Sequence, residues 1–193
     1  MLRSRTARTS RRRGQALAEF ALAAPIFFVL MLGLIELGRA VYYMQILDSA
    51  ARDGARYAIV HGFQSAAFGQ CPSGPMPNGG TNTCDPDGNL VLDAVRARSI
   101  GVTDKAGSLT ANVKWCDASL YQSDPPASSC GDYDLATSAP VPCADWAGVG
   151  DGDNNRGQIV TVCVEYAYDS FLAGVLPIPD FTVTGRATLV VNN

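Results

Sequence analysis

Residues 16–37 read ALAEFALAAPIFFVLMLGLIEL, an almost unbroken run of apolar side chains. About twenty such residues, wound as an α-helix, cross the roughly 30 Å of hydrocarbon in a bilayer. A core helix of a water-soluble protein would instead need partner surface on all its sides. The sequence therefore predicts one membrane-spanning helix close to the N-terminus.

The charge distribution predicts the orientation of this helix. The first fourteen residues hold no acidic residue and six arginines, Arg3, Arg5, Arg8, Arg11, Arg12 and Arg13. The rest of the chain is acidic, because it carries all 18 acidic residues of the sequence. The positive-inside rule then predicts a cytoplasmic N-terminus and a C-terminal domain on the far side. No basic patch with interleaved aromatic residues follows, so we expect no nucleic-acid partner.

A cleaved signal peptide is an alternative interpretation of the same segment. The apolar run is longer than a usual signal core, and the junction GRAV at residues 38–41 offers no good small-x-small cleavage site. Such a signal would leave a secreted protein that begins near Val41. The run Ser10-Arg11-Arg12-Arg13 also resembles a twin-arginine signal, which would need a cleavage site as well.

Beyond Leu37 the helical pattern continues and becomes amphipathic. Small and apolar residues recur at steps of three and four, at Ala40, Met44, Leu47, Ala51, Gly54, Ala55 and Ala58. A helix from about Gln15 to His61, ending at Gly62, would be on the order of 70 Å long. We expect its stripe of small residues to pack closely against a domain or against a sister helix.

Two carboxylates interrupt the apolar pattern. Glu19 lies inside the span, where an unpaired charge costs a few kcal/mol. If the chain were cut between Gly14 and Gln15, the new α-amine would lie one helical turn from Glu19. A neighbouring subunit's amine could serve equally, or Glu19 could simply lie at headgroup depth. Glu36, with Arg39 three residues on, is expected at the solvated opposite interface, and Pro25 is expected to kink the span or loosen its hydrogen bonding.

Two sequence blocks point to a known family. Residues 13–20 read RGQALAEF and residues 50–58 read AARDGARYA, with an apolar span between them. In combination they resemble the TadE-like family of tight-adherence (Flp-type) pilus assembly proteins, which are pseudopilins. The segment from Val160 to Val191 is more loosely similar to the closing strands of that family.

The resemblance implies prepilin processing. A membrane prepilin peptidase would cut after Gly14 and free Gln15, and Glu19 would be needed for the cut or would pair with an N-terminal amine. It also implies other pilins, the inner-membrane pilus machinery and the lipid bilayer as partners. Gln15 replaces the phenylalanine usual in major type IV pilins, which puts N-methylation in doubt. With the large C-terminal body, this indicates a minor or accessory subunit. A membrane-anchored extracytoplasmic binding module without processing is the alternative function.

The predicted fold is α+β, with a long N-terminal helix packed on a small antiparallel sheet and disulfide-stapled loops. We expect a basic cytoplasmic leader over residues 1–14, a long helix over residues 15–62 with its transmembrane part at about 16–37, and an extracytoplasmic domain over residues 63–193. A short helix is predicted over residues 90–100, with its apolar face at Leu90, Val91, Ala94, Val95 and Ala97. Strands are predicted over residues 109–115, 158–168 and 181–191.

All six cysteines follow the span, at positions Cys71, Cys84, Cys116, Cys130, Cys143 and Cys163. No Cys-x-x-Cys motif exists, and His61 is the sole histidine, so disulfides are favoured over zinc. Fifteen pairings are possible. The simplest expectation joins Cys71 to Cys84 and Cys130 to Cys143, which leaves Cys116 to join Cys163.

The remaining motifs offer little chemistry. Asp85 and Asp87, and likewise Asp151 and Asp153, place oxygen ligands at alternate positions, as a calcium loop does, but neither loop has a glutamate at its twelfth position. Turn formation is the favoured interpretation, and we expect no resident metal or cofactor. Nucleophilic catalysis would have to use His61, and no phosphate-binding glycine-rich loop exists. We therefore expect a structural or assembly role and no enzymatic activity.

Overall fold

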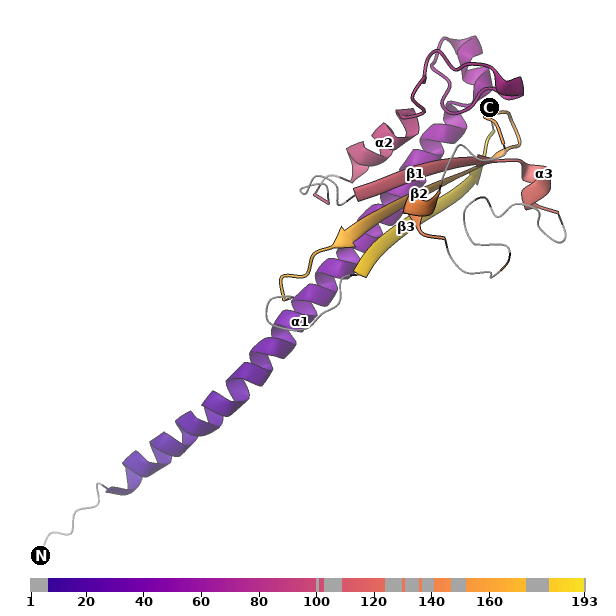
Figure 1. Cartoon of the computed structure of the whole chain (residues 1–193). Helices are drawn as coiled ribbons and strands as arrows, with labels where there is room; N and C mark the ends of the chain where they lie inside the picture. Colours follow the sequence, from indigo (N-terminus) through magenta and orange to yellow (C-terminus); the bar gives the residue numbers. More distant parts are fainter. Residues whose placement is uncertain are drawn as a thin grey trace, which may run out of the picture.

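The computed structural model describes residues 7–99, 101–102, 109–123, 130, 136, 141–146, 152–172 and 181–192. Helix α1 (Ala7–Val60) is continuous over 54 residues and includes Pro25. At 1.5 Å per residue it is about 80 Å long. Its N-terminal half projects from the rest of the protein, and the other elements gather along its C-terminal half (Figure 1). The long helix predicted from the sequence is confirmed, and it begins already inside the basic leader.

A three-stranded antiparallel sheet lies on the C-terminal half of α1. Its strands are β1 (Leu109–Cys116), β2 (Ile159–Tyr168) and β3 (Phe181–Val190), in the order β1-β2-β3. Helix α2 (Leu90–Arg98) packs beside α1. The mixed α+β fold and the three predicted strands are confirmed. The short elements are η1 (Phe63–Phe68), η2 (Pro77–Gly79), α3 (Ala118–Tyr121) and η3 (Cys143–Asp145).

The main core lies between α1 and the sheet. Alternate residues of β2 turn toward α1, and Val160, Val162 and Val164 are fully buried. From α1 the buried residues are Leu47, Ala50, Ala51, Ala55 and Ala58. The stripe of small residues thus packs against the protein's own domain, which was one of the two partners expected for it.

Two positions on the predicted apolar faces are solvent-exposed. Met44 is 52% exposed, because the sheet contacts α1 through the neighbouring face that carries Tyr43 and Leu47. Ala97 is also exposed, since α2 buries only Val91 and Val95 fully. Periodicity identifies the set of apolar positions, but the partner's position decides which of them it covers.

Glycine lets two backbones approach closely where β3 crosses α1. A Cβ added to Gly185 would lie 2.3 Å from the carbonyl carbon of Leu47 and 2.5 Å from the nitrogen of Asp48. These are backbone atoms, which cannot rotate away as a side chain does. Gly185 therefore sets the distance between β3 and the helix.

The disulfides join Cys71 to Cys84, Cys116 to Cys130 and Cys143 to Cys163. The first predicted pair is confirmed and the other two predicted pairs are wrong. The strand register explains why Cys116 cannot reach Cys163: Cys116 lies opposite Ile159, whereas Cys163 lies opposite Asn112. Four residues along a strand separate their positions by about 13 Å, and a disulfide requires Cα atoms within about 7 Å.

Peptide mapping under non-reducing conditions tests these pairings. Protease digestion of the oxidised protein is expected to release one linked pair that contains Cys116 and Cys130 and another that contains Cys143 and Cys163. Both bonds pin loops to the face of the sheet that is turned away from α1, where Cys163 and Thr161 are buried. A peptide linking Cys116 to Cys163 would contradict the strand register itself.

Candidate processing site and membrane helix

Gly14 and Glu19 lie on the part of α1 that projects from the domain. Residues 14–23 are all exposed, and a Cβ added to Gly14 would meet no atom within 4 Å. The Gln15 side-chain amide donates to the Glu19 carboxylate, with 3.1 Å between Nε2 and Oε1. The geometry therefore brings Gln15 and Glu19 together on one helical turn and leaves Gly14 open to an approaching enzyme.

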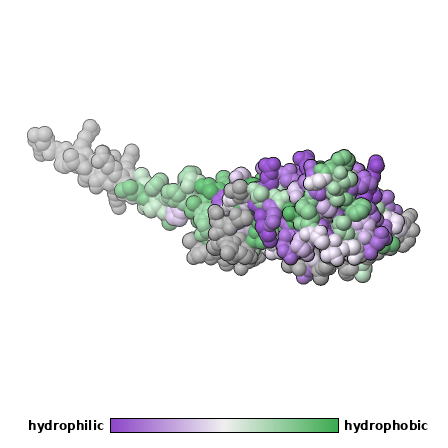
Figure 2. All heavy atoms as spheres, turned by 90° about the horizontal axis from the view of Figure 1, so that it is seen from above, coloured by the Kyte–Doolittle hydropathy of each residue, from purple (hydrophilic) through white to green (hydrophobic). Residues whose placement is uncertain are grey.

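The projecting part of α1 presents large apolar side chains on all its sides. In Figure 2 this rod is coloured mainly as hydrophobic, while hydrophilic residues concentrate on the domain. Its exposed large side chains are Leu17, Phe20, Leu22, Ile26, Phe27, Phe28, Val29, Leu30, Met31, Leu34, Ile35 and Leu37. Among the described residues, α1 is the one helix long and apolar enough to cross a membrane. Exposure of so much apolar surface to water is unfavourable, and a bilayer would cover it.

Hydrogen bonds lie at the boundary between the projecting rod and the domain, and one of them holds the domain to α1. Arg39 Nη1 donates to Glu36 Oε2 at 3.1 Å, and the Tyr168 hydroxyl donates to the Glu36 carbonyl oxygen at 3.2 Å. Glu36 is only 8% exposed, so the expectation that it is solvated is wrong. The physical reason is that the end of β2 packs over this turn of α1.

An aromatic cluster at the same boundary was not predicted. The Arg39 guanidinium lies over the rings of Tyr43, Tyr168 and Phe171, at 5.4–5.8 Å from their centroids. Tyr168 stacks on Phe181 with 4.6 Å between the ring centroids. The sequence signals of this cluster are Tyr42 and Tyr43, just after the span, and the tyrosines at the end of β2. The sequence does not show that these residues contact one another, because that contact depends on the sheet register.

Burial raises the pKa of Tyr168 to about 12, and the Arg39 guanidinium partly opposes this shift. An unfolded tyrosine has a pKa near 10. The folded state therefore holds the Tyr168 proton more tightly, and this stabilising contribution is complete below about pH 10 and is lost as the pH rises toward about 12.

We expect the protein to lose stability between about pH 10 and pH 12, and a Tyr168→Phe variant to lose less over that range. At neutral pH the variant should be less stable by about 1 kcal/mol, because it lacks the hydrogen bond to Glu36. Urea unfolding in detergent micelles at several pH values measures both effects. Parallel pH curves for the parent and the variant would exclude Tyr168 as the group responsible.

The comparisons with known proteins point to the same helix. A family model described as TadE-like protein matches the chain from Gly14 to Arg56. Residues 14–56 are thus similar to TadE-like proteins, and we call them the TadE-like segment. The match confirms the resemblance seen in the sequence, and it begins at Gly14 and includes Gln15 and Glu19. Comparisons with curated proteins and with solved structures find no significant match.

The TadE-like segment coincides with part of α1 alone. It includes the apolar rod, the boundary at Glu36 and Arg39, and most of the half that packs on the sheet. It ends before α2, the three strands and all three disulfides. The match therefore gives no information on the domain that packs against the TadE-like segment.

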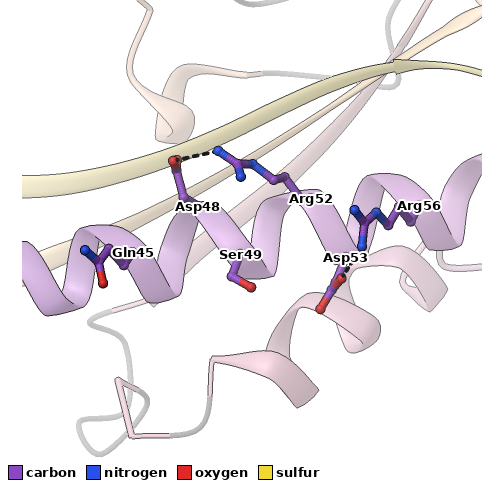
Figure 3. A pocket seen from close by; sticks show the side chains of 6 residues that line it. All are labelled: Gln45, Asp48, Ser49, Arg52, Asp53 and Arg56. Carbon is purple, nitrogen blue, oxygen red and sulfur yellow. Dashed lines mark hydrogen bonds and ion pairs between the residues drawn. The ribbon is translucent and has the colours of Figure 1, made fainter.

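The outer half of the TadE-like segment has a polar face opposite the core. Figure 3 shows it as a row of polar side chains along α1. Arg52 pairs with Asp48 at 3.3 Å, and Arg56 pairs with Asp53 at 3.6 Å. Exposed pairs of this kind contribute at most about 0.5 kcal/mol each. Asp53 also pairs with Arg98 of α2 at 3.1 Å, so this face is a solvated surface that also helps to hold α2.

His61 directly follows the end of α1, and its ring contacts Tyr57. Its ring stacks on Tyr57 with 4.0 Å between centroids, and Nδ1 lies 3.0 Å from the Tyr57 carbonyl oxygen. The imidazole thus lies against a carbonyl at the C-terminus of α1 that also accepts the backbone N–H of His61. Within the part of the chain that the structure describes, no group of three or more His, Cys, Asp or Glu side chains could hold a metal ion.

The two acidic loops use their carboxylates to hold turns. Asp85 is buried and accepts hydrogen bonds from the backbone N–H groups of Gly74, Asn89 and Leu90. Asp153 accepts from the backbone N–H of Asn155. Asp87 is exposed, and Asp151 lies outside the described residues. These bonds support the turn interpretation over a calcium loop.

Proposed function

We propose that the protein is a minor pseudopilin or accessory subunit of a tight-adherence (Flp, type IVb-like) pilus, with a structural role in its assembly. One observation carries the proposal: the match to TadE-like proteins begins at Gly14, where the chain is exposed, uncontacted and followed by an apolar helix. This is the arrangement that a membrane peptidase and a helix-packed assembly both need.

Processing would hydrolyse the peptide bond between Gly14 and Gln15. Proteases bind their substrates in extended form, so the helix must open at this bond. Glycine assists the opening, because it is less favourable than alanine in a helix by about 1 kcal/mol. No tertiary contact of Gly14 would have to break. The cut removes the arginine-rich leader and leaves a positively charged α-amine on Gln15.

Glu19 would then serve as the partner of an α-amine. In the uncut chain its carboxylate already accepts a hydrogen bond from the residue one turn earlier. A charge inside hydrocarbon is stable only when paired. The amine of the same chain would neutralise Glu19 within one helix, whereas the amine of a neighbouring pilin would also draw two apolar helices side by side.

The proposed organisation follows from the charges. Residues 1–14 form the cytoplasmic leader of a single-pass inner-membrane protein, residues 15–62 the helix, with its span at about 16–37, and residues 63–193 the extracytoplasmic domain. The prepilin peptidase, other pilins, the pilus machinery and the lipid bilayer are the proposed partners. An oxidising compartment outside the membrane suits the three disulfides.

N-terminal sequencing of the protein isolated from its native membrane tests the proposal. A mature chain that begins at Gln15 is the expected result. A chain that begins at Met1 would reduce the protein to an anchored binding module, and one that begins near Val41 would make it a secreted protein. Replacing residues 16–37 by an unrelated span should abolish assembly of the pseudopilin, whereas a tethered binding module would keep its function.

A further inference from the structure

We propose that the extracytoplasmic domain docks on the lipid surface through an aromatic collar, which consists of Tyr42, Tyr43, Tyr168, Phe171 and Phe181. The inference rests on the membrane span in the proposed function and adds a second membrane contact, made by the sheet itself. In this arrangement the domain lies against the bilayer rather than being held away from it on a stalk.

The collar joins segments that are far apart in the sequence. Tyr42 and Tyr43 come from α1, Tyr168 ends β2, Phe171 follows it, and Phe181 begins β3. The rings contact one another in a chain, with 5.7 Å from Tyr43 to Tyr168 and 4.6 Å from Tyr168 to Phe181. Arg39 lies over three of the rings. The tertiary fold therefore builds one continuous surface around α1.

Part of the collar is solvent-exposed. Tyr42 is 59% exposed, Phe171 48% and Phe181 41%. Large aromatic side chains with this much exposure at one end of a domain indicate a contact surface. Its position identifies the partner, because the surface is continuous with the apolar rod of α1, whose end lies at Leu37.

The depth of the collar agrees with the headgroup region of a bilayer. If the hydrocarbon begins at Ala16, about 30 Å of helix ends near Ile35. The headgroups add roughly 5–7 Å on each side, or about four more residues, which reaches Arg39. Phe171 lies 5.4 Å from the Arg39 guanidinium. The rings of the domain are therefore at the level where aromatic residues concentrate in membrane proteins.

The polar atoms of the collar fit a lipid interface as well. Aromatic rings with hydroxyl groups prefer this zone because one end is apolar and the other is wet. The Arg39 side chain is partly exposed and can meet lipid phosphate while its stem lies among the rings.

Tryptophan fluorescence in bilayers of brominated phosphatidylcholine tests the proposal on the full-length chain. Bromine near the top of the acyl chains quenches tryptophan at the interface. The variants are Phe171→Trp and Phe181→Trp. Phe63→Trp is the matched control, because Phe63 is 40% exposed and lies beyond the far end of α1. The native Trp115 and Trp146 are buried and supply a background that the parent chain measures.

The added emission of Phe171→Trp and Phe181→Trp is expected to shift to the blue and to be quenched several-fold more than that of Phe63→Trp. Phe27→Trp lies in the middle of the span and reports on the span alone. Its quencher is lipid that carries bromine deep in the acyl chains. If Phe27→Trp is quenched but the two collar variants behave like Phe63→Trp, the docking surface is overturned and the pseudopilin proposal stands. Unquenched Phe27→Trp would overturn both.

Folding is verified for each variant by the near-ultraviolet spectrum and by its three intact disulfides. Phe181 stacks on Tyr168, so its replacement carries the greater risk of misfolding. If Phe181→Trp does not fold, Phe171→Trp decides the test by itself, because Phe171 follows the end of β2 and is the more exposed of the two.

Discussion

Replacing Gly14 by alanine is expected to leave the chain uncut, with the leader of residues 1–14 still attached. Alanine places a methyl group beside the bond to be hydrolysed, and it stabilises the helix that the peptidase must open by about 1 kcal/mol. The substitution has no structural cost in the folded protein, because no atom lies within 4 Å of the new Cβ. N-terminal sequencing and intact mass of the membrane fraction measure the outcome directly.

Gly33→Ala is the matched control for this experiment. Gly33 also lies in the exposed part of α1, and a Cβ there would likewise meet nothing within 4 Å. Both substitutions make the same chemical change in the same helix, so only the position differs. The control chain should begin at Gln15. A Gly14→Ala chain that also begins at Gln15 would exclude Gly14 as the recognised residue and with it the prepilin interpretation.

Replacing Gly185 by alanine is expected to have the largest effect on folding. The added methyl would lie 2.3 Å from the backbone of Leu47, so β3 and α1 must move apart. Their separation would loosen the core at Val162 and Val164 of β2, the strand that pairs with β3 and belongs to the same core. Overpacking of this kind costs about 2–3 kcal/mol, which corresponds to a fall of roughly 5–10 °C in Tm for a domain of this size.

Thermal unfolding in detergent micelles, followed by near-ultraviolet circular dichroism, measures this loss. The buried Trp115 and Trp146 supply the signal. Gly38→Ala is the control, because a Cβ at Gly38 in α1 meets no neighbouring atom. The control should melt with the parent. An unchanged Tm for Gly185→Ala would mean that β3 does not approach α1 as closely as described.

Prediction from the sequence succeeds here wherever the signal is local. The apolar run and the stripe of small residues require a long helix. The alternation at Val160, Val162 and Val164 requires a strand, and each pattern repeats within a few residues. The proposed processing site, which stays a prediction, rests on the same kind of local signal, since Gly14, Gln15 and Glu19 lie within two turns of one helix. None of these features depends on where another element lies.

The cysteine pairing shows where local reasoning ends. Sequence distance suggested that Cys130 joins Cys143, and exclusion then left Cys116 for Cys163. The register of β1 against β2 separates the last two along the strands and places Asn112 opposite Cys163. The Asn112 amide donates to the carbonyl oxygen of Cys143 in η3, which brings Cys143 to Cys163. Register depends on which face of each strand is buried and on the turns between strands, and six cysteine positions carry no information on either.

The sequence by itself determined the long apolar helix, the arginine-rich segment before it and the three strands. The tertiary structure alone decided the pairings of Cys116 with Cys130 and of Cys143 with Cys163, the burial of Glu36, the approach of Gly185 to α1 and the gathering of Tyr43, Tyr168 and Phe181 into a collar. The physical reason is how far apart in the sequence the contacting residues lie. Helices and strands arise from contacts between near neighbours in the chain. The disulfide pairings depend instead on the pairing of strands, and the other three features arise where β2 and β3 pack on a helix more than a hundred residues away.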